Sequence, residues 1–161
     1  MILVAGIGNI FLGDDGFGSE VARQMSQSVV DAGVRVVDFG IRGVDFLYAL
    51  LDGYDATIII DALSRGAAPG TIYVIEPDLH ELTDNAAPVE PHAMDPFRIL
   101  GMARSMGAVF RNVRIVGCEP ATFGPPDEGQ MELSACVSAA VGQAVDVVQG
   151  LVAEMSRVAA K

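Results

Sequence analysis

The sequence predicts an α/β fold: a three-layer α/β/α sandwich built on a mostly parallel sheet of about five strands. Three observations support this prediction. Short apolar runs alternate with segments of helical periodicity, the runs are apolar on both faces, and glycines or prolines separate them. Strands that helices cover on both sides have this character. At 161 residues the chain fits one domain, residues 1–161, with a core of its own.

Each element follows from a local pattern. The apolar runs predict strands over residues 2–7, 34–39, 56–60, 71–75 and 113–117. A first helix follows the loop 8–16, because Val21, Met25 and Val29 recur every four residues, and Gly33 ends it. Further helices are predicted from about residue 44 to 51, and from Pro96, which suits a first helical turn, to about 106. Ser134 is predicted to cap a final helix with a valine face: Val137, Val141, Val145, Val148 and Val152.

Composition excludes several classes of protein. The net charge is −11, with 10 Lys and Arg against 21 Asp and Glu. Phosphate backbones and anionic membrane surfaces are bound by clustered cations, so neither nucleic acid nor a membrane surface is an expected partner. No apolar run reaches the ~18 residues of a membrane span. The chain opens directly into a strand-like run without a signal-peptide pattern, and we therefore expect a cytoplasmic protein. Its two cysteines, Cys118 and Cys136, are expected to be reduced and packed rather than catalytic.

In a parallel sheet of this kind, chemistry belongs in the loops beyond the carboxyl ends of the strands. The first such loop is rich in glycine and delivers Asp14 and Asp15 to the start of the first helix. It is not a dinucleotide fingerprint, because Phe11 stands where the third glycine belongs, and no Gly-Lys-Ser/Thr of a P-loop follows. Helix capping explains one aspartate but leaves its neighbour unexplained, so we assign a functional role to at least one of them.

Two more residues extend this candidate site. Asp61 directly follows an apolar run, at the carboxyl edge of a central strand, where an aspartate serves either as a turn cap or as a ligand. His92 lies in Glu-Pro-His-Ala-Met, and a histidine in such a loop is more often structural. Taken together, Asp15, Asp61 and His92 offer two carboxylates and one imidazole, a donor set that suits a divalent metal.

Conventional hydrolytic nucleophiles are missing. The chain has no Gly-x-Ser-x-Gly elbow and no Asp-Thr/Ser-Gly of an aspartic protease. His80-Glu81 begins like a zinc-protease helix, but Asp84 stands in place of the second histidine. Any hydrolysis would therefore rely on metal-bound water or on a carboxylate base.

Residues 2–9, Ile-Leu-Val-Ala-Gly-Ile-Gly-Asn, and residues 13–18, Gly-Asp-Asp-Gly-Phe-Gly, closely resemble the opening of the hydrogenase maturation endopeptidases. The likeness continues in the same order almost to the end of the chain. It includes Ile-Ile-Asp-Ala at 59–62, Pro-Gly at 69–70, Pro-His at 91–92, Val-Gly-Cys-Glu-Pro at 116–120 and Leu-Ser at 133–134. The first segment is highly specific, whereas each of the others is weak alone.

The resemblance implies an α/β sandwich and a site. Members of this family cut a C-terminal extension from the large-subunit precursor of a nickel–iron hydrogenase after nickel insertion. The family's metal ligands correspond to Asp15, Asp61 and His92, which would engage the nickel of the bound substrate; another divalent metal in the free enzyme is a second option. Asp38, or another carboxylate nearby, would help to activate water. The family's Asp-Gly-Gly-Thr is Asp38-Phe39-Gly40-Ile41 here, which suggests a subgroup matched to its own client.

Two other functions stay open at this point. The first is a nickel chaperone or checkpoint protein that uses the same three ligands without cleavage. The second is a hydrolase of another substrate, with Asp14 and Asp15 as acid and base. The oligomeric state is not fixed by the sequence, although a monomer is favoured.

Overall fold

The computed structural model describes residues 1–28, 32–82, 95–125 and 127–159. Its elements alternate as predicted. The strands are β1 (Ile2–Ile7), β2 (Val34–Gly40), β3 (Ala56–Ala62), β4 (Ile72–Ile75) and β5 (Val113–Cys118). The helices are a 3-10 turn, η1 (Gly13–Gly16), and four α-helices: α1 (Phe17–Gln27), α2 (Gly43–Leu50), α3 (Pro96–Ser105) and α4 (Ala135–Ala159).

The five strands form one mixed, mostly parallel sheet in the order β2-β1-β3-β5-β4. β1 pairs in parallel with both β2 and β3, and β3 pairs in parallel with β5, while β4 is antiparallel to β5. The chain leaves β1 toward one edge to form β2 and then returns past it to form β3. The carboxyl ends of β1 and β3 therefore flank the point where strand order reverses, which is where open α/β sheets bind ligands.

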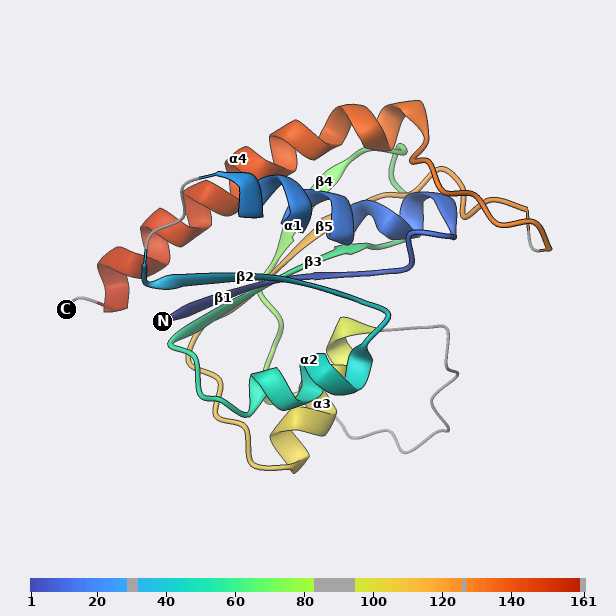
Figure 1. Ribbon diagram of the computed structural model, residues 1–161. Helices are drawn as coiled ribbons and strands as arrows, with labels where there is room; N and C mark the ends of the chain where they lie inside the picture. Colours follow the sequence, from blue (N-terminus) through green and yellow to red (C-terminus); the bar gives the residue numbers. More distant parts are fainter. Residues whose placement is uncertain (29–31, 83–94, 126, 160–161) are drawn as a thin grey trace.

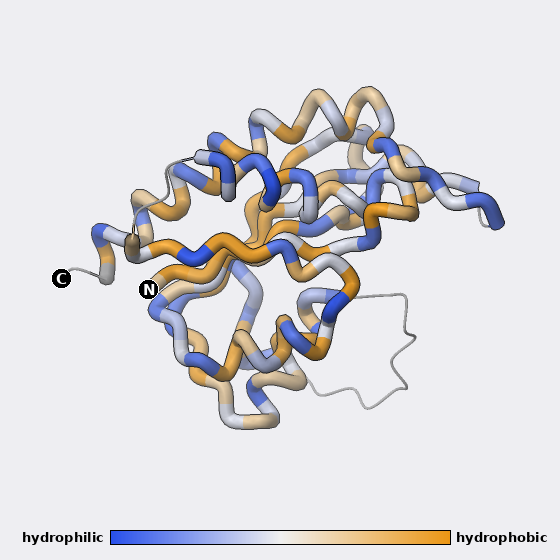
Figure 2. The backbone as a smooth tube through the Cα atoms, viewed as in Figure 1, coloured by the Kyte–Doolittle hydropathy of each residue, from blue (hydrophilic) through white to orange (hydrophobic). Residues whose placement is uncertain are grey.

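Helices cover both faces of the sheet, as a three-layer sandwich requires. α1 and α4 lie on one face, and α2 and α3 lie on the other (Figure 1). Two apolar cores result: the α1/α4 side includes Val4, Ile58 and Ile60, and the α2/α3 side includes Leu3 and Ile59. The central strands form the apolar band between the helical layers in Figure 2. Alternate residues of one strand thus enter opposite cores, which explains why these strands read as uninterrupted apolar runs.

Two predicted boundaries were wrong. α1 does not continue to Gly33: it ends at Gln27, and Ser28 already has an extended backbone, with φ −80° and ψ 152°. Serine side chains compete for backbone hydrogen bonds and so weaken a helix end; the hydroxyls of Ser26 and Ser28 donate to carbonyls one turn earlier. Val29 lies outside the described residues. The strand predicted to stop before Asp61 extends to Ala62, so Asp61 belongs to β3 itself.

The valine face of α4 packs as predicted. Val137, Val141 and Val148 are buried against the sheet and α1, and Val145 and Val152 are partly buried beside them. By length and composition α4 is the one helix in the described residues that would reach across a membrane, but this apolar face belongs to the core. Ser134 accepts the first helical bond, from the Ser138 amide, at 2.8 Å. Ser134 thus stands at the predicted N-cap position, and its hydroxyl donates to Asp14.

Candidate functional site

The loop after β1 is shaped by two glycines that permit close backbone contacts. A methyl group at Gly18 would come within 2.2 Å of the carbonyl oxygens of both Ile7 and Ile60, so glycine lets α1 rest directly on β1 and β3. Gly8 has φ +128°, and a methyl group there would overlap the carbonyl oxygen of Asp15 at 1.8 Å. The glycine pattern of this loop therefore holds Asp15 against the end of β1; it does not serve a dinucleotide.

Asp15 lies at this junction, in η1. The Asn9 amide donates to its Oδ2 at 2.8 Å, which fixes the direction of the carboxylate. Burial raises the pKa of Asp15 above its usual value, and the Asn9 hydrogen bond only partly opposes that effect. Within the part of the chain that the structure describes, the Asn9 amide is thus the donor that orients this carboxylate, and no cation pairs with it.

Asp61 approaches the same place from β3. It is 5% exposed, and its Oδ1 accepts a 2.9 Å hydrogen bond from the Ala62 amide. A methyl group on Gly8 would lie 3.9 Å from that Oδ1, so both Asp61 and the Asp15 backbone border Gly8. Burial, followed by the negative charges of Asp15 and Asp95, raises the pKa of Asp61 well above its usual value. A buried carboxylate beside a partly buried one, each with one donor among the described residues, is a set that a cation would stabilise.

The structure therefore brings together two of the three predicted ligands, Asp15 and Asp61. His92 lies outside the described residues. Within residues 1–28, 32–82, 95–125 and 127–159, no three His, Cys, Asp or Glu side chains are grouped closely enough to hold a metal ion. The site assembled from the described chain is a carboxylate pair at the β1/β3 switch point, which η1 and β3 supply.

Asp14 has a different surrounding from its neighbour. It is fully buried, and its two oxygens accept four hydrogen bonds: from the amides of Ala121, Thr122 and Ser134 and from the Ser134 hydroxyl, at 2.7–3.0 Å. Burial acts to raise the pKa of Asp14, but these hydrogen bonds outweigh it and leave the pKa lowered. These four hydrogen bonds connect η1 to the loop 119–134. Asp14 is thus saturated with donors, which argues against an acid or base role for it.

Asp38, the predicted helper, is the fifth residue of β2 and is exposed. Its Oδ1 accepts hydrogen bonds from the Ser19 hydroxyl at 2.7 Å and the Gly40 amide at 2.9 Å. A methyl group on Gly40 would lie 3.9 Å from this Oδ1 and 3.8 Å from the Gly8 carbonyl oxygen. Asp38 thus lies beside the hydrogen-bonded pair Gly8 and Gly40, and Gly8 in turn borders Asp61.

Sequence reasoning missed two acidic residues. Glu119 is 6% exposed, directly after β5, and accepts hydrogen bonds from the Tyr73 hydroxyl at 2.5 Å and from the amides of Arg65 and Gly66. The Tyr73 bond, helped by those amides, lowers the pKa of Glu119. Asp95 caps α3 through the Phe97 amide while its charge acts on Asp61. An acidic residue after a buried strand is the signal that would have identified Glu119.

Both cysteines were predicted to be reduced and packed, and the structure confirms packing for only one of them. Both are free thiols. Cys118 is buried, and burial, with the nearby Asp14 charge, raises its pKa to about 12, so it packs as predicted and is not nucleophilic. Cys136 is exposed on the first turn of α4, and the prediction that it packs was wrong. Its Sγ lies 3.3 Å from the Ser134 hydroxyl, at the exposed start of α4.

These features define a class: a small doubly wound α/β protein with an acidic pair at its switch point. Comparison with known proteins narrows the class. The family model of the hydrogenase maturation proteases matches residues 19–150. A Methanocaldococcus jannaschii protein assigned to the hydrogenase maturation proteases is 31% identical over 152 residues, or 92% of this chain and 94% of that protein. This chain belongs to the hydrogenase maturation protease family.

Other relatives agree. The hydrogenase expression/formation protein HupD of Rhizobium leguminosarum is 31% identical over 127 residues, which are 74% of this chain but only 59% of HupD. Among solved structures, the hydrogenase maturating endopeptidase HybD of Escherichia coli superposes with a TM-score of 0.78 at 25% identity, covering 95% of this chain and 92% of HybD. A hydrogenase 2 maturation peptidase from a Thaumarchaeota archaeon gives a TM-score of 0.70 at 29% identity, with 94% and 97% coverage.

Proposed function

We propose that this chain is an endopeptidase that removes a C-terminal extension from the large-subunit precursor of a nickel–iron hydrogenase once nickel has been inserted. The observation that carries the proposal is the Asp15–Asp61 pair at the β1/β3 switch point, in a chain of the hydrogenase maturation protease family. We assign Asp15, Asp61 and His92 to contact with the nickel that the precursor brings, so nickel is part of the substrate.

The electrostatics of the pair support this assignment. A buried carboxylate whose pKa is raised by a second carboxylate is destabilised when both are ionised. A divalent cation that arrives with the substrate removes this penalty, because both carboxylates can then be negative at low cost. An apo precursor brings no such cation, so cleavage becomes dependent on nickel loading.

The nickel supplies Lewis acidity near the scissile peptide. Asp15 and Asp61 orient the precursor around its metal, and Asp38 acts as the base. One oxygen of Asp38 is held by Ser19 and Gly40, while no donor among the described residues bonds to the other. That second oxygen takes a proton from water as the water attacks the peptide carbonyl, and the proton then passes to the leaving amine. The C–N bond breaks to give a new carboxyl terminus and a free amine.

The cysteines and the net charge bear on the compartment and the partner that we propose. The free thiols of Cys118 and Cys136 suit a reducing compartment, and we place the enzyme in the cytoplasm. The net charge of −11 suits a basic or metal-bearing protein partner.

The test is to mix the protein with nickel-loaded large-subunit precursor and to weigh the products by mass spectrometry. C-terminal truncation of the loaded precursor, with apo precursor left intact, is the expected result. Transfer of nickel without truncation would identify a chaperone or checkpoint protein instead. Equal cleavage of apo precursor would remove nickel from recognition.

A further inference from the structure

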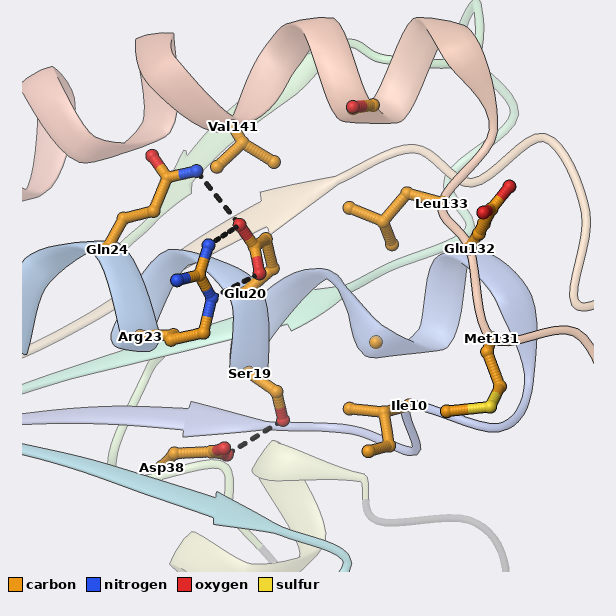
Figure 3. Close-up of a pocket in the computed structure, with 12 residues that line it drawn as sticks. Ile10, Ser19, Glu20, Arg23, Gln24, Asp38, Met131, Glu132, Leu133 and Val141 are labelled. Atoms are coloured by element: carbon orange, nitrogen blue, oxygen red, sulfur yellow. Dashed lines mark hydrogen bonds and ion pairs between the residues drawn. The ribbon is translucent and has the colours of Figure 1, made fainter.

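A groove runs along α1, from the first turns of α4 to Asp38 on β2. It has a volume of about 550 Å³ and lies between α1, the segment 131–133 and the first turns of α4 (Figure 3). Leu133 and Val141 point into it from one side, and Ile10 and Met131 border its lower end. Met131 is 70% exposed and Ile10 45%, although both are large apolar side chains. Exposed apolar side chains at the rim of a hollow are a feature of binding surfaces.

This groove is continuous with the candidate site. A second hollow of about 240 Å³ shares Ile10, Ser19 and Asp38 with it and extends along residues 39–42 to Gly8. Gly8 borders Asp61, as described above. A chain lying in the two hollows would therefore pass from the carboxylate pair, along Asp38, and out between α1 and α4.

Charged side chains of both signs line this path. Arg42, which borders the second hollow, pairs with Asp45 at 3.6 Å and donates to the carbonyl oxygens of Asp38 and Phe39. Glu20 is neutralised by Arg23, which donates to both of its oxygens at 2.6 and 2.8 Å. Asp38 near one end and Glu132 near the other take part in no ion pair among the described residues. Both arginines on the path are thus engaged with acids, Arg23 with Glu20 and Arg42 with Asp45. Asp38 and Glu132 remain as negative charges without an ion pair among the described residues, and they complement an occupant that carries a cation beside its apolar side chains.

We propose that this groove binds the C-terminal extension of the precursor as an extended peptide that carries apolar side chains and at least one Lys or Arg. The inference rests on the proposed function, because the carboxylate pair holds the nickel-bearing body of the substrate and the severed segment must leave from there. An extended peptide can follow the groove into the second hollow, which shares Ile10, Ser19 and Asp38 with it. Leu133 and Val141 contact its apolar side chains, and Glu132 pairs with its cation.

Two substitutions at exposed positions test the groove. Ser138→Trp fills it from α4, and Glu132→Lys reverses the charge at its far end. Two matched controls make the same changes outside it: Ala139→Trp is the next residue on α4, and Glu128→Lys lies in the loop before it. Equal thermal unfolding of all four variants establishes that folding is unaffected.

With nickel-loaded precursor, each groove variant should raise KM at least about fivefold and change kcat much less, because ground-state contacts are lost. Both controls should resemble wild type. A second measurement needs no client: fluorescence anisotropy of two labelled peptides of equal length, which alternate valine with either lysine or glutamate. The lysine peptide should bind wild type and the controls, bind the groove variants at least about fivefold more weakly, and exceed the glutamate peptide in affinity.

The two measurements separate the inference from the function on which it rests. Cleavage with unchanged KM in both groove variants would overturn the groove and leave the peptidase standing. Failure of wild type to cleave loaded precursor would overturn the peptidase, and the peptides alone would then decide. Equal binding of the lysine and glutamate peptides, or equal binding to wild type and Ser138→Trp, would show that the groove is not a site for basic peptides.

Discussion

Asp14 and Asp15 are neighbours in the chain and in η1, yet their carboxylates have opposite environments. Asp14 accepts four hydrogen bonds and its pKa is lowered, whereas Asp15 accepts one and its pKa is raised by burial. The same contrast separates Asp61 and Glu119, which lie at the carboxyl ends of the adjacent strands β3 and β5. Glu119 is surrounded by donors, while among the described residues Asp61 accepts a hydrogen bond only from the Ala62 amide.

The comparison shows that burial alone does not distinguish a functional carboxylate. Asp14, Asp61 and Glu119 are all buried. What differs is the number of donors. A carboxylate whose lone pairs are all used by amides and hydroxyls is a structural tie, and no cation is needed to stabilise it. A buried carboxylate with one donor beside another of its kind has unused acceptor capacity that a metal ion can fill.

The largest expected effect comes from removing the negative charge of Asp61. Asp61→Asn keeps the size of the side chain but removes the charge that would hold a cation. Processing of nickel-loaded precursor should fall about a hundredfold, since a metal ligand contributes more than the tenfold typical of weaker contacts. The rate of appearance of the truncated large subunit, followed by mass spectrometry, measures this. Normal processing by a folded Asp61→Asn protein would show that Asp61 has only a structural role in β3.

Asp14→Asn should act on stability instead. The asparagine amide places two N–H donors where the Ser134 amide or the Ala121 and Thr122 amides need an acceptor, so buried donors lose their partners. The expected cost is about 2 kcal/mol, which lowers Tm by roughly 4–8 °C in a chain of this size. Thermal unfolding at neutral pH measures the loss. An unchanged Tm, with processing abolished, would make Asp14 the chemical residue and Asp15 its support, the reverse of the present assignment.

The sequence predicted the sheet well because each strand is buried on both faces and so leaves a run such as residues 56–60 that no helix pattern matches. It also placed Asp15 and Asp61 at one edge, since parallel strands end together. The predictions failed where distant residues decide. Ser134 stands at the start of α4 as predicted, but its hydroxyl and its amide both donate to Asp14, 120 residues away in the chain, which no local pattern reveals. Nothing local in the pair Asp14-Asp15 reveals which one meets the donors of the loop 119–134.

The groove over α1 escaped prediction for the same reason. Its wall is made by α1 and by the segment 131–133, which are far apart in sequence. Met131 and Ile10 read as ordinary apolar residues near a helix or strand end, and only the packing of α4 beside α1 leaves them open to solvent. Likewise, Glu119 lies in a Pro- and Gly-rich stretch that predicts a loop but not the Tyr73 hydroxyl that it binds.

The smallest expected effect is a pH dependence of stability that has opposite signs at the two kinds of carboxylate. Asp61 has a folded-state pKa above the unfolded value of about 3.9, so its contribution to stability is fully present below that pH and is lost as pH rises through the folded pKa. Asparagine does not titrate. In EDTA, Asp61→Asn should therefore gain Tm relative to wild type as pH rises from about 4 to 7, by roughly 2–4 °C, the equivalent of about 1 kcal/mol.

Asp14 has a lowered folded pKa, so its contribution is present above about pH 4 and is lost as pH falls through the folded pKa, and the deficit of Asp14→Asn should shrink in acid. Calorimetric scans of the three proteins across this range measure both trends. If neither difference in Tm between variant and wild type changed with pH, the two carboxylates would be equally well solvated. The contrast between the structural carboxylate Asp14 and the site carboxylate Asp61 would then have no electrostatic basis.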